Sequence, residues 1–431
     1  MSSPRIYNLF PKLVGSMAGW IDHLDRIRDM AFDWVYVNPW HYPGYSGSLY
    51  SVKDYYRYAD LFLQGDEPGD VQLSRFIDAA HARGLKVMMD LVINHTAFDA
   101  ELTKSHPEWY QHEADGSIKH PGCLDNGGWV SWGDLAQIDH LGPHHDALWA
   151  YWLEMMTHYL SLGVDGFRCD AAYHVPLAVW QYLLPAVRER YPETRFFGET
   201  LGCPAKDIVA LAEVGFDYVF NSSKWWDLQS DWFLKDYRKW VGCAPSISFP
   251  ESHDTPRYAA EVGGDEAAMR QRYCFEALLS AGVMMPIGYE FGFCTPIDVV
   301  KTRPEAWETP YFDLRDYLRE VNLLKVEYPI FGMDGDLVPV KTENPYVVAL
   351  IKQSFDKRHK ALLVLNADRH HWHRAHLPKI ADEMGVADVV DVSLGHRMAN
   401  VPESLVYDLH PAEIKVFVGI NEYVTHQVLV G

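Results

Sequence analysis

The sequence predicts an α/β fold: a (β/α)8 TIM barrel with a short inserted domain after its third strand and a C-terminal antiparallel β-sandwich domain. Three features of the 431-residue chain lead to this prediction. Short apolar runs alternate with amphipathic helical stretches, one long segment interrupts that alternation, and the last part of the chain changes to strand patterns without helices. We therefore assign residues 1–94 and 146–328 to the barrel, 95–145 to the inserted domain and 329–431 to the sandwich.

Eight apolar runs before residue 290 are strand candidates, and eight parallel strands are the number that closes such a barrel. The predicted strands are 5–10, 34–39, 85–94, 164–170, 194–199, 216–221, 246–251 and 283–288. Amphipathic periodicity predicts helices between them. The helical spacing is easiest to see at 20–30 and 71–80, and further predicted helices are 146–161, 177–190, 205–213, 230–240 and 266–280.

Two segments depart from the barrel pattern. Residues 95–145 are rich in His, Gly, Pro and Trp and have no clear period, and a connection of that length is usually functional or a small domain. From about residue 330 the runs LVPVKT, YVVALIKQ, KALLVLN and EIKVFV follow one another without intervening helices. That pattern is typical of an antiparallel sandwich.

Composition and charge exclude several classes of binding partner and cofactor. The formal net charge of −21 argues against nucleic acid and anionic membranes, because both are polyanions that would repel the chain. No apolar run reaches transmembrane length and the first residues lack a signal-peptide pattern, so we expect a cytoplasmic protein. The six cysteines contain no CxxC pair, and no dinucleotide, P-loop or zinc-protease motif is present. We therefore expect no required cofactor.

Polar residues end several of the predicted strands, where barrel enzymes place their reactive groups. They are Asp90 and His95 at the third strand, Arg168 and Asp170 at the fourth, Glu199 at the fifth, and His253 with Asp254 at the seventh. Each alone could be an ordinary turn or helix-cap residue. Together, four carboxylates would meet at one barrel mouth, where their mutual repulsion is costly unless function requires it.

Two carboxylates facing each other across a bond are what glycoside cleavage needs: one protonated to donate to the leaving oxygen, the other ionised. Arg168 lies two residues before Asp170 and so on the same face of its strand. The guanidinium is therefore placed to keep Asp170 ionised through a charge-assisted hydrogen bond.

Four separated segments resemble the characteristic motifs of the alpha-amylase family of glycoside hydrolases. They are DLVINH (90–95), GFRCDAAYH (166–174), FFGET (196–200) and FPESHD (249–254), in the family's order. The resemblance implies that Asp170 is the nucleophile, Glu199 the acid/base and Asp254 the stabiliser of the transition state.

The same resemblance implies a set of substrate-binding residues. LYSVKDYY (49–56) resembles the family's Tyr-x-x-x-Asp-Tyr segment, which would make Tyr50 an aromatic platform beneath the reactive sugar. The complete predicted set is Tyr50, Asp90, His95, Arg168, His174 and His253. His174 follows Tyr173 where the family often has Lys-His. Asn94 stands at a calcium-ligand position of many relatives, which leaves a structural calcium ion open, but we assign no metal ligands.

The sequence therefore predicts a retaining alpha-glycosidase that acts on alpha-1,4-linked gluco-oligosaccharides or alpha-glucans through a covalent glycosyl-enzyme intermediate. One alternative is a transglycosylase of the 4-alpha-glucanotransferase or maltosyltransferase type. RIYNLFP and HPEWYQHEADGSI (106–118) resemble, more faintly, the branch of the family that uses maltose 1-phosphate. A remote alternative is a non-catalytic sugar-binding barrel, because a fold does not by itself imply a function. The sequence does not indicate an oligomeric state.

Overall fold

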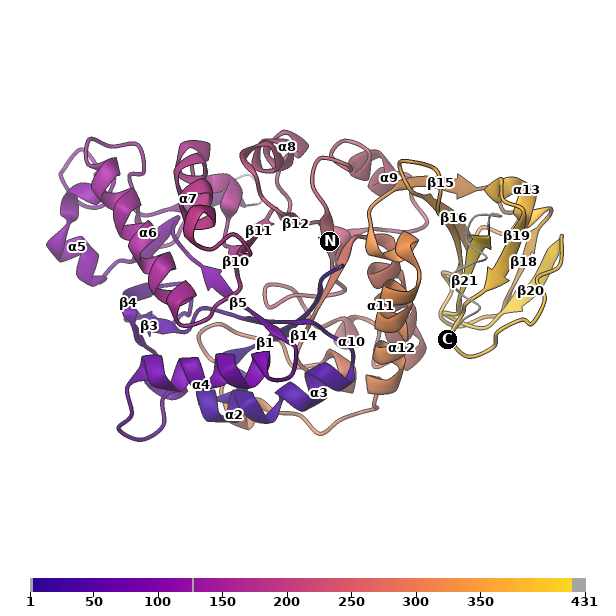
Figure 1. Ribbon diagram of the computed structural model, residues 1–431, viewed down its shortest axis with the longest axis horizontal. Coiled ribbons are helices and arrows are strands. Elements are labelled where there is room, and N and C mark those ends of the chain that lie inside the picture. Colours follow the sequence, from indigo (N-terminus) through magenta and orange to yellow (C-terminus); the bar gives the residue numbers. More distant parts are fainter. Residues whose placement is uncertain (1–2, 126–127, 421–431) are drawn as a thin grey trace.

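The computed structural model describes residues 3–125 and 128–420, and in it eight parallel strands close a barrel (Figure 1). Around the barrel the order is β1-β2-β5-β10-β11-β12-β13-β14, and β14 pairs with β1 to close the ring. The strands are β1 (Arg5–Leu9), β2 (Trp34–Val37), β5 (Lys86–Leu91), β10 (Gly166–Cys169), β11 (Arg195–Glu199), β12 (Tyr218–Phe220), β13 (Ser246–Ser248) and β14 (Gly282–Pro286). The predicted barrel fold is confirmed.

Alternation along the strands divides the barrel residues into two sets. One set packs inside the barrel and consists largely of bulky side chains, among them Ile6, Trp34, Met88, Phe197 and Ile247. The other set faces the helices and joins the main core of the molecule. Because the interior is filled with apolar groups, the polar inward-facing residues gather at the carboxyl ends of the strands.

Helices between the strands cover the outside of the barrel. They are α1 (Pro11–Val14), α2 (Met17–Asp22), α3 (Leu24–Asp29), α4 (Gly69–His81), α6 (His145–Ser161), α7 (Leu177–Arg190), α8 (Ala205–Val214), α9 (Trp232–Tyr237), α10 (Tyr258–Glu261), α11 (Glu266–Leu279) and α12 (Arg315–Glu327). Within the described ranges, no helix has the length and apolar character needed to span a membrane.

Several barrel strands are shorter than the apolar runs that predicted them. The run at 85–94 continues after β5 ends at Leu91, and the run at 246–251 continues after β13 ends at Ser248. Val92, Ile93 and Phe249 are nevertheless buried. Apolar composition therefore overestimates the length of these strands, because the loops that follow them at the barrel mouth are also buried.

The segment after β5 has local structure that its sequence did not reveal. β6 (His95–Ala97) pairs with β9 (Leu135–Gln137), and β7 (Gly122–Asp125) pairs with β8 (Gly128–Ser131). The short helix α5 (Glu101–Ser105) lies between β6 and β7 in sequence. A further hairpin, β3 (His41–Pro43) with β4 (Val52–Tyr58), follows β2 and was not predicted. Apart from β4, these strands have only three or four residues, which are too few to give a period in sequence.

The C-terminal part is a two-sheet structure beside the barrel (Figure 1). Its five-stranded sheet has the order β15-β16-β17-β21-β19, with β15 (Asp336–Val340), β16 (Val347–Gln353), β17 (Lys360–Asn366), β19 (Asp388–Asp391) and β21 (Ile414–Ile420). β18 (His373–Leu377) and β20 (Leu405–Leu409) form the second sheet, and the two sheets share one apolar core. The antiparallel sandwich is as predicted, except that it also contains helix α13 (Ile380–Met384). Residues 421–431 of the predicted domain lie outside the described residues.

Candidate active site

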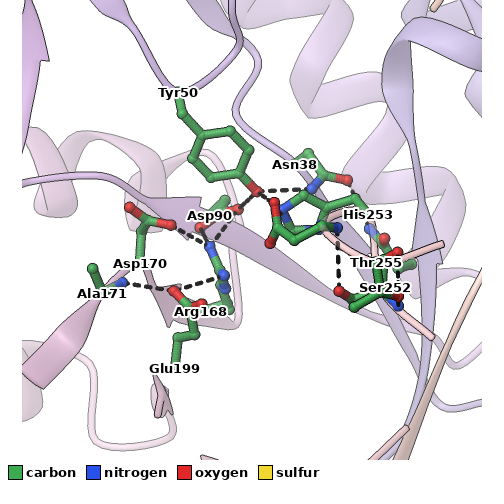
Figure 2. A network of polar contacts seen from close by, with 12 residues as sticks. Asn38, Tyr50, Asp90, Arg168, Asp170, Ala171, Glu199, Ser252, His253 and Thr255 are labelled. Carbon is green, nitrogen blue, oxygen red and sulfur yellow. Dashed lines mark hydrogen bonds and ion pairs between the residues drawn. The ribbon is translucent and has the colours of Figure 1, made fainter. Parts of the chain in front are cut away.

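One arginine holds three carboxylates at the carboxyl end of the barrel (Figure 2). Arg168 Nη1 lies 2.9 Å from Asp90 Oδ1 and 2.7 Å from Asp170 Oδ1, and Nη2 lies 2.9 Å from Glu199 Oε2. The strand register explains this arrangement, since Arg168 of β10 is directly opposite Asp90 of β5 and pairs on its other side with β11, which ends at Glu199. Three residues far apart in sequence thus share one cation.

Asp170 lies just after β10 and is largely buried. Burial raises the pKa of its carboxyl well above the ordinary value, and the Arg168 guanidinium offsets this effect only in part. Neighbouring carboxylates, including Glu199 and Asp90, add to the increase. The predicted contact with Arg168 is present, and its positive charge opposes the effect of burial on the Asp170 pKa; that this contact keeps Asp170 ionised stays a prediction.

Glu199 ends β11, and its side chain is 15% exposed. Its Oε2 accepts a hydrogen bond of 2.8 Å from the backbone N–H of Ala171, the residue after the predicted nucleophile. Ala171 has φ of 43°, a left-handed conformation that costs energy for a residue with a Cβ. The strained turn therefore ties the backbone at Asp170 to the side chain of Glu199. Glu199 also borders a small cavity with Leu201, Phe220, Phe249 and Met284.

Asp254 lines the same cavity, and its side chain is 51% exposed. Its Oδ2 lies 3.0 Å from His253 Nε2. Desolvation acts to raise the pKa of Asp254, but the charge and hydrogen bond of His253 lower it to about 2. Asp254 is therefore an ionised carboxylate that is open to solvent across the cavity from the Arg168 cluster.

Tyr50 comes from the turn before β4, and its hydroxyl reaches into the cluster (Figure 2). The hydroxyl lies 2.6 Å from Asp90 Oδ2 and 2.6 Å from His253 Nε2. The Tyr50 ring stacks on the His253 imidazole, with centroids 5.2 Å apart and planes inclined by 7°. One face of the ring is thus covered by His253, and the role of Tyr50 as a sugar platform stays a prediction.

Asp90 was predicted among the substrate-binding residues, and the structure corrects this. Its side chain is fully buried, and its oxygens accept hydrogen bonds from Arg168, Tyr50 and Tyr36. Because all these donors belong to the protein, Asp90 holds the Arg168 and Tyr50 side chains in position and does not face a substrate.

The two remaining histidines differ in their surroundings. His95 is buried, its Nε2 lies 3.2 Å from the Tyr50 carbonyl oxygen, and its Nδ1 lies 3.3 Å from Asn94 Nδ2. Burial lowers the pKa of His95 to about 4, so its ring is neutral at physiological pH. His174 is exposed, follows the strained turn at Ala171 and packs against Tyr173. Sugar binding by either histidine stays a prediction.

Two residues of the cluster were missed in the sequence. Tyr36 Oη donates to Asp90 Oδ2 at 2.5 Å, and Asn38 Nδ2 donates to the Tyr50 hydroxyl at 2.9 Å. Asn38 directly follows β2. The strand-end criterion that selected Asp90 and Glu199 applies to Asn38 as well. Applied to every predicted strand, it selects this residue.

The sequence left open a structural calcium ion at Asn94. In the parts of the chain that the structure describes, no three His, Cys, Asp or Glu side chains are grouped so that they could hold a metal ion. The side-chain amide of Asn94, the candidate calcium ligand, contacts the His95 ring. Calcium binding stays an open prediction.

Part of the barrel sequence matches a known family model. Residues 5–202, which include Asp170 and Glu199, match the model described as "Alpha amylase, catalytic domain". Residues 5–202 are therefore similar to the catalytic domain of the alpha-amylase family. The family resemblance predicted from four short motifs is thereby confirmed.

Proteins similar to this chain include both transferases and hydrolases. The chain is 25% identical over 384 residues to an alpha-1,4-glucan:maltose-1-phosphate maltosyltransferase from Burkholderia pseudomallei, covering 86% of this chain and 33% of that protein. It is 26% identical over 345 residues to the alpha-amylase MalA of Haloarcula japonica, covering 75% of this chain and 47% of that protein. The chain thus spans only about a third to a half of the length of these two relatives.

The fold is also that of solved alpha-amylase family structures. An alpha-amylase from Lactobacillus plantarum superposes with a TM-score of 0.78 at 21% identity, covering 97% of this chain and 99% of that chain. An isomaltulose synthase from Klebsiella sp. LX3 superposes with a TM-score of 0.75 at 15% identity, covering 96% and 98%. At these identities the likeness shows the fold and leaves the reaction to be argued from the site.

Proposed function

We propose that this chain is a retaining alpha-glycosidase that acts on alpha-1,4-linked gluco-oligosaccharides through a covalent glycosyl-enzyme intermediate. The observation that supports it is the pairing of Asp170 and Glu199 on one guanidinium, with the ionised Asp254 across the cavity. Two carboxyl groups with different surroundings are the requirement for this chemistry.

In the first step, the Asp170 carboxylate attacks the anomeric carbon while the bond from that carbon to the leaving oxygen breaks. Glu199 transfers its proton to the leaving oxygen, and a glycosyl ester of Asp170 remains. In the second step, Glu199, now ionised, removes a proton from water, whose oxygen attacks the anomeric carbon and breaks the ester. Asp254 is positioned to stabilise the positive charge that the sugar carries in both transition states.

Transglycosylation is the second candidate, and it differs only in the acceptor of the second step. A sugar hydroxyl in place of water would give a longer oligosaccharide from the same intermediate. The maltosyltransferase relatives favour this candidate and add maltose 1-phosphate as a donor to test. A cytoplasmic location is part of the proposal, and it would favour imported oligosaccharides or stored glycogen over extracellular starch. A non-catalytic sugar-binding barrel remains the third reading.

The test is a product analysis of maltotriose to maltoheptaose, and separately of maltose 1-phosphate with maltoheptaose, incubated with the wild type and Asp170→Asn. We expect shorter sugars from the wild type and a rate lower by about 10⁴-fold or more in the variant, because the nucleophile is lost. Asp391→Asn, which alters a buried carboxylate of the sandwich, is the matched control.

The product pattern separates the candidates. Longer products as well as shorter ones would establish a transferase, and turnover of the phosphate donor alone would replace the proposed substrate. If the folded wild type converts none of these sugars, the proposal fails and a non-catalytic barrel takes its place.

A further inference from the structure

The Tyr50 hydroxyl connects the two sides of the site (Figure 2). On one side, Tyr50 donates to Asp90, which contacts Arg168 and through it Asp170. On the other side, the same hydroxyl contacts His253, which contacts Asp254. The predicted nucleophile and the predicted stabiliser therefore belong to one continuous network of polar contacts, in which His253 Nε2 faces both the Tyr50 hydroxyl and Asp254 Oδ2.

The positions of the hydrogens in this network follow from counting donors. The Tyr50 hydroxyl has one hydrogen and gives it to Asp90 Oδ2, at 2.6 Å. Burial raises the pKa of Tyr50 well above its ordinary value, so the hydroxyl keeps this hydrogen. Its oxygen can then only accept from His253, which must carry its hydrogen on Nε2. Nδ1 of His253 is buried and has no hydrogen-bond partner among the described residues.

Asn38 supplies the other hydrogen bond to the Tyr50 oxygen, at 2.9 Å. The orientation of its amide is fixed, because Asn38 Oδ1 accepts from Asn8 Nδ2 at 2.8 Å and the NH₂ group must then face Tyr50. Asn8 also donates to the Tyr36 carbonyl oxygen, at 3.2 Å. Both asparagines are fully buried. Three neighbouring segments, β1, β2 and the turn before β4, thus fix the position of one hydroxyl.

We propose that Asn38 is a positioning residue for the reaction, and that it acts by holding the Tyr50 hydroxyl where it joins His253 and Asp254 to Asp90, Arg168 and Asp170. This inference rests on the proposed function. Without Asn38, the hydroxyl would lose a donor and the Tyr50 ring would be free to tilt away from His253. Displacing reacting groups by about 1 Å can cost up to about 100-fold in rate.

A loosened Tyr50 also changes the charge balance around Asp170. Asp90 would lose a donor and attract the shared guanidinium more strongly, leaving Asp170 less neutralised. The charged groups that face Asp170 are Arg168, Asp90, Glu199 and Asp254. Of these only Arg168 lowers its pKa, so the pKa of Asp170 would rise. The acid limb of kcat/KM would therefore move to higher pH.

The experiment compares Asn38→Leu, Tyr50→Phe and the double variant in pH profiles of maltoheptaose turnover. Each single variant should lower kcat/KM by about 10- to 100-fold and move the acid limb upward. If Asn38 acts through the Tyr50 hydroxyl, and not through its 3.2 Å hydrogen bond to the Tyr36 hydroxyl, Asn38→Leu should add little in the Tyr50→Phe background, because both changes remove the hydrogen bond between Asn38 and Tyr50. Tyr50→Phe keeps the ring and removes only the hydroxyl. It therefore tests the hydroxyl's contacts with Asp90 and His253 even if Asn38→Leu does not fold.

Asn322→Leu is the matched control, since Asn322 is also fully buried and bonded to a tyrosine hydroxyl, that of Tyr273, at 2.8 Å. It should lower stability without moving the acid limb. Additive effects of Asn38→Leu and Tyr50→Phe, or an acid limb that moves equally in Asn322→Leu, would overturn the proposal.

Crystal structures of Asn38→Leu and Tyr50→Phe give a readout that does not depend on turnover. We expect the 5.2 Å stack between residue 50 and His253 to be displaced in both variants. An unchanged stack would refute the positioning role whatever the activity. If the stack is displaced in the variants but the wild type is inactive, the positioning role of Asn38 is supported and the proposed function is rejected.

Discussion

At the scale of single residues, the site depends on the geometry of one guanidinium. Arg168 uses two nitrogens to contact Asp90, Asp170 and Glu199 at 2.7 to 2.9 Å. Its planar fork can serve several carboxylates at once, whereas the single nitrogen of a lysine cannot. The sequence suggested only the contact with Asp170, because the other two partners come from neighbouring strands.

Arg168→Lys should therefore reduce kcat/KM by about 10²- to 10³-fold, the cost of removing one preorganised donor from a reacting site. The pKa of Asp170, already raised by burial, should rise further as its counter-charge weakens. Activity then requires a higher pH, because Asp170 must be ionised to attack. Steady-state kinetics between pH 4 and pH 9, in the range where both proteins stay folded, measures both effects. An acid limb at the same pH in both proteins would contradict this expectation.

At the scale of the elements, the barrel closes where β14 fits between β13 and β1. Gly282 begins β14, and a Cβ there would lie 2.3 Å from Ile247 Cδ1 and 2.9 Å from the Pro4 carbonyl oxygen. Glycine is thus required at this position by the close approach of neighbouring strands. The pattern of apolar runs locates β14 but does not reveal why it must begin with glycine.

Gly282→Ala should lower the free energy of unfolding by about 1–3 kcal/mol, because the strands on both sides of β14 must move apart. Gly133→Ala is the matched control, since a Cβ there would meet no atom within 4 Å. Urea denaturation of the two variants and the wild type measures the difference. Equal midpoints for Gly282→Ala and the wild type would show that the barrel accommodates the methyl group without a loss of stability, which would contradict this expectation.

At the scale of the whole molecule, a buried lysine connects the sandwich to the barrel. Lys352 of β16 is fully buried, and its Nζ donates to the Leu278 carbonyl oxygen of α11 at 2.9 Å. Burial lowers the pKa of Lys352 to about 7, although the charge of Asp334 acts in the opposite direction. The interface between the two parts of the chain therefore contains an amine that is neutral above about pH 7.

This group makes stability depend on pH. Between pH 7 and the ordinary lysine pKa near 10.5, the unfolded chain binds the proton that the folded chain has released, so stability rises with pH over this range. Lys352→Met should reduce that rise and, near pH 7, increase the free energy of unfolding by about 1 kcal/mol, because a buried amine is replaced by an apolar group. Urea midpoints at pH 6, 7, 8 and 9 check both expectations. A variant with the same pH dependence as the wild type would exclude Lys352 as the cause.

The local pattern of the sequence determined the barrel, its eight strands and the residues at their ends. Apolar alternation and strand-end polar residues are properties of neighbours in the chain, so Asp170, Glu199 and Asp254 could be selected from the sequence alone. The partners of those residues depended on tertiary structure, because strand register brings Asp90 beneath Arg168 and the β2 end beside Tyr50. Burial, and with it the raised pKa of Asp170 and the enclosure of Asp90, likewise exists only when distant segments exclude water together.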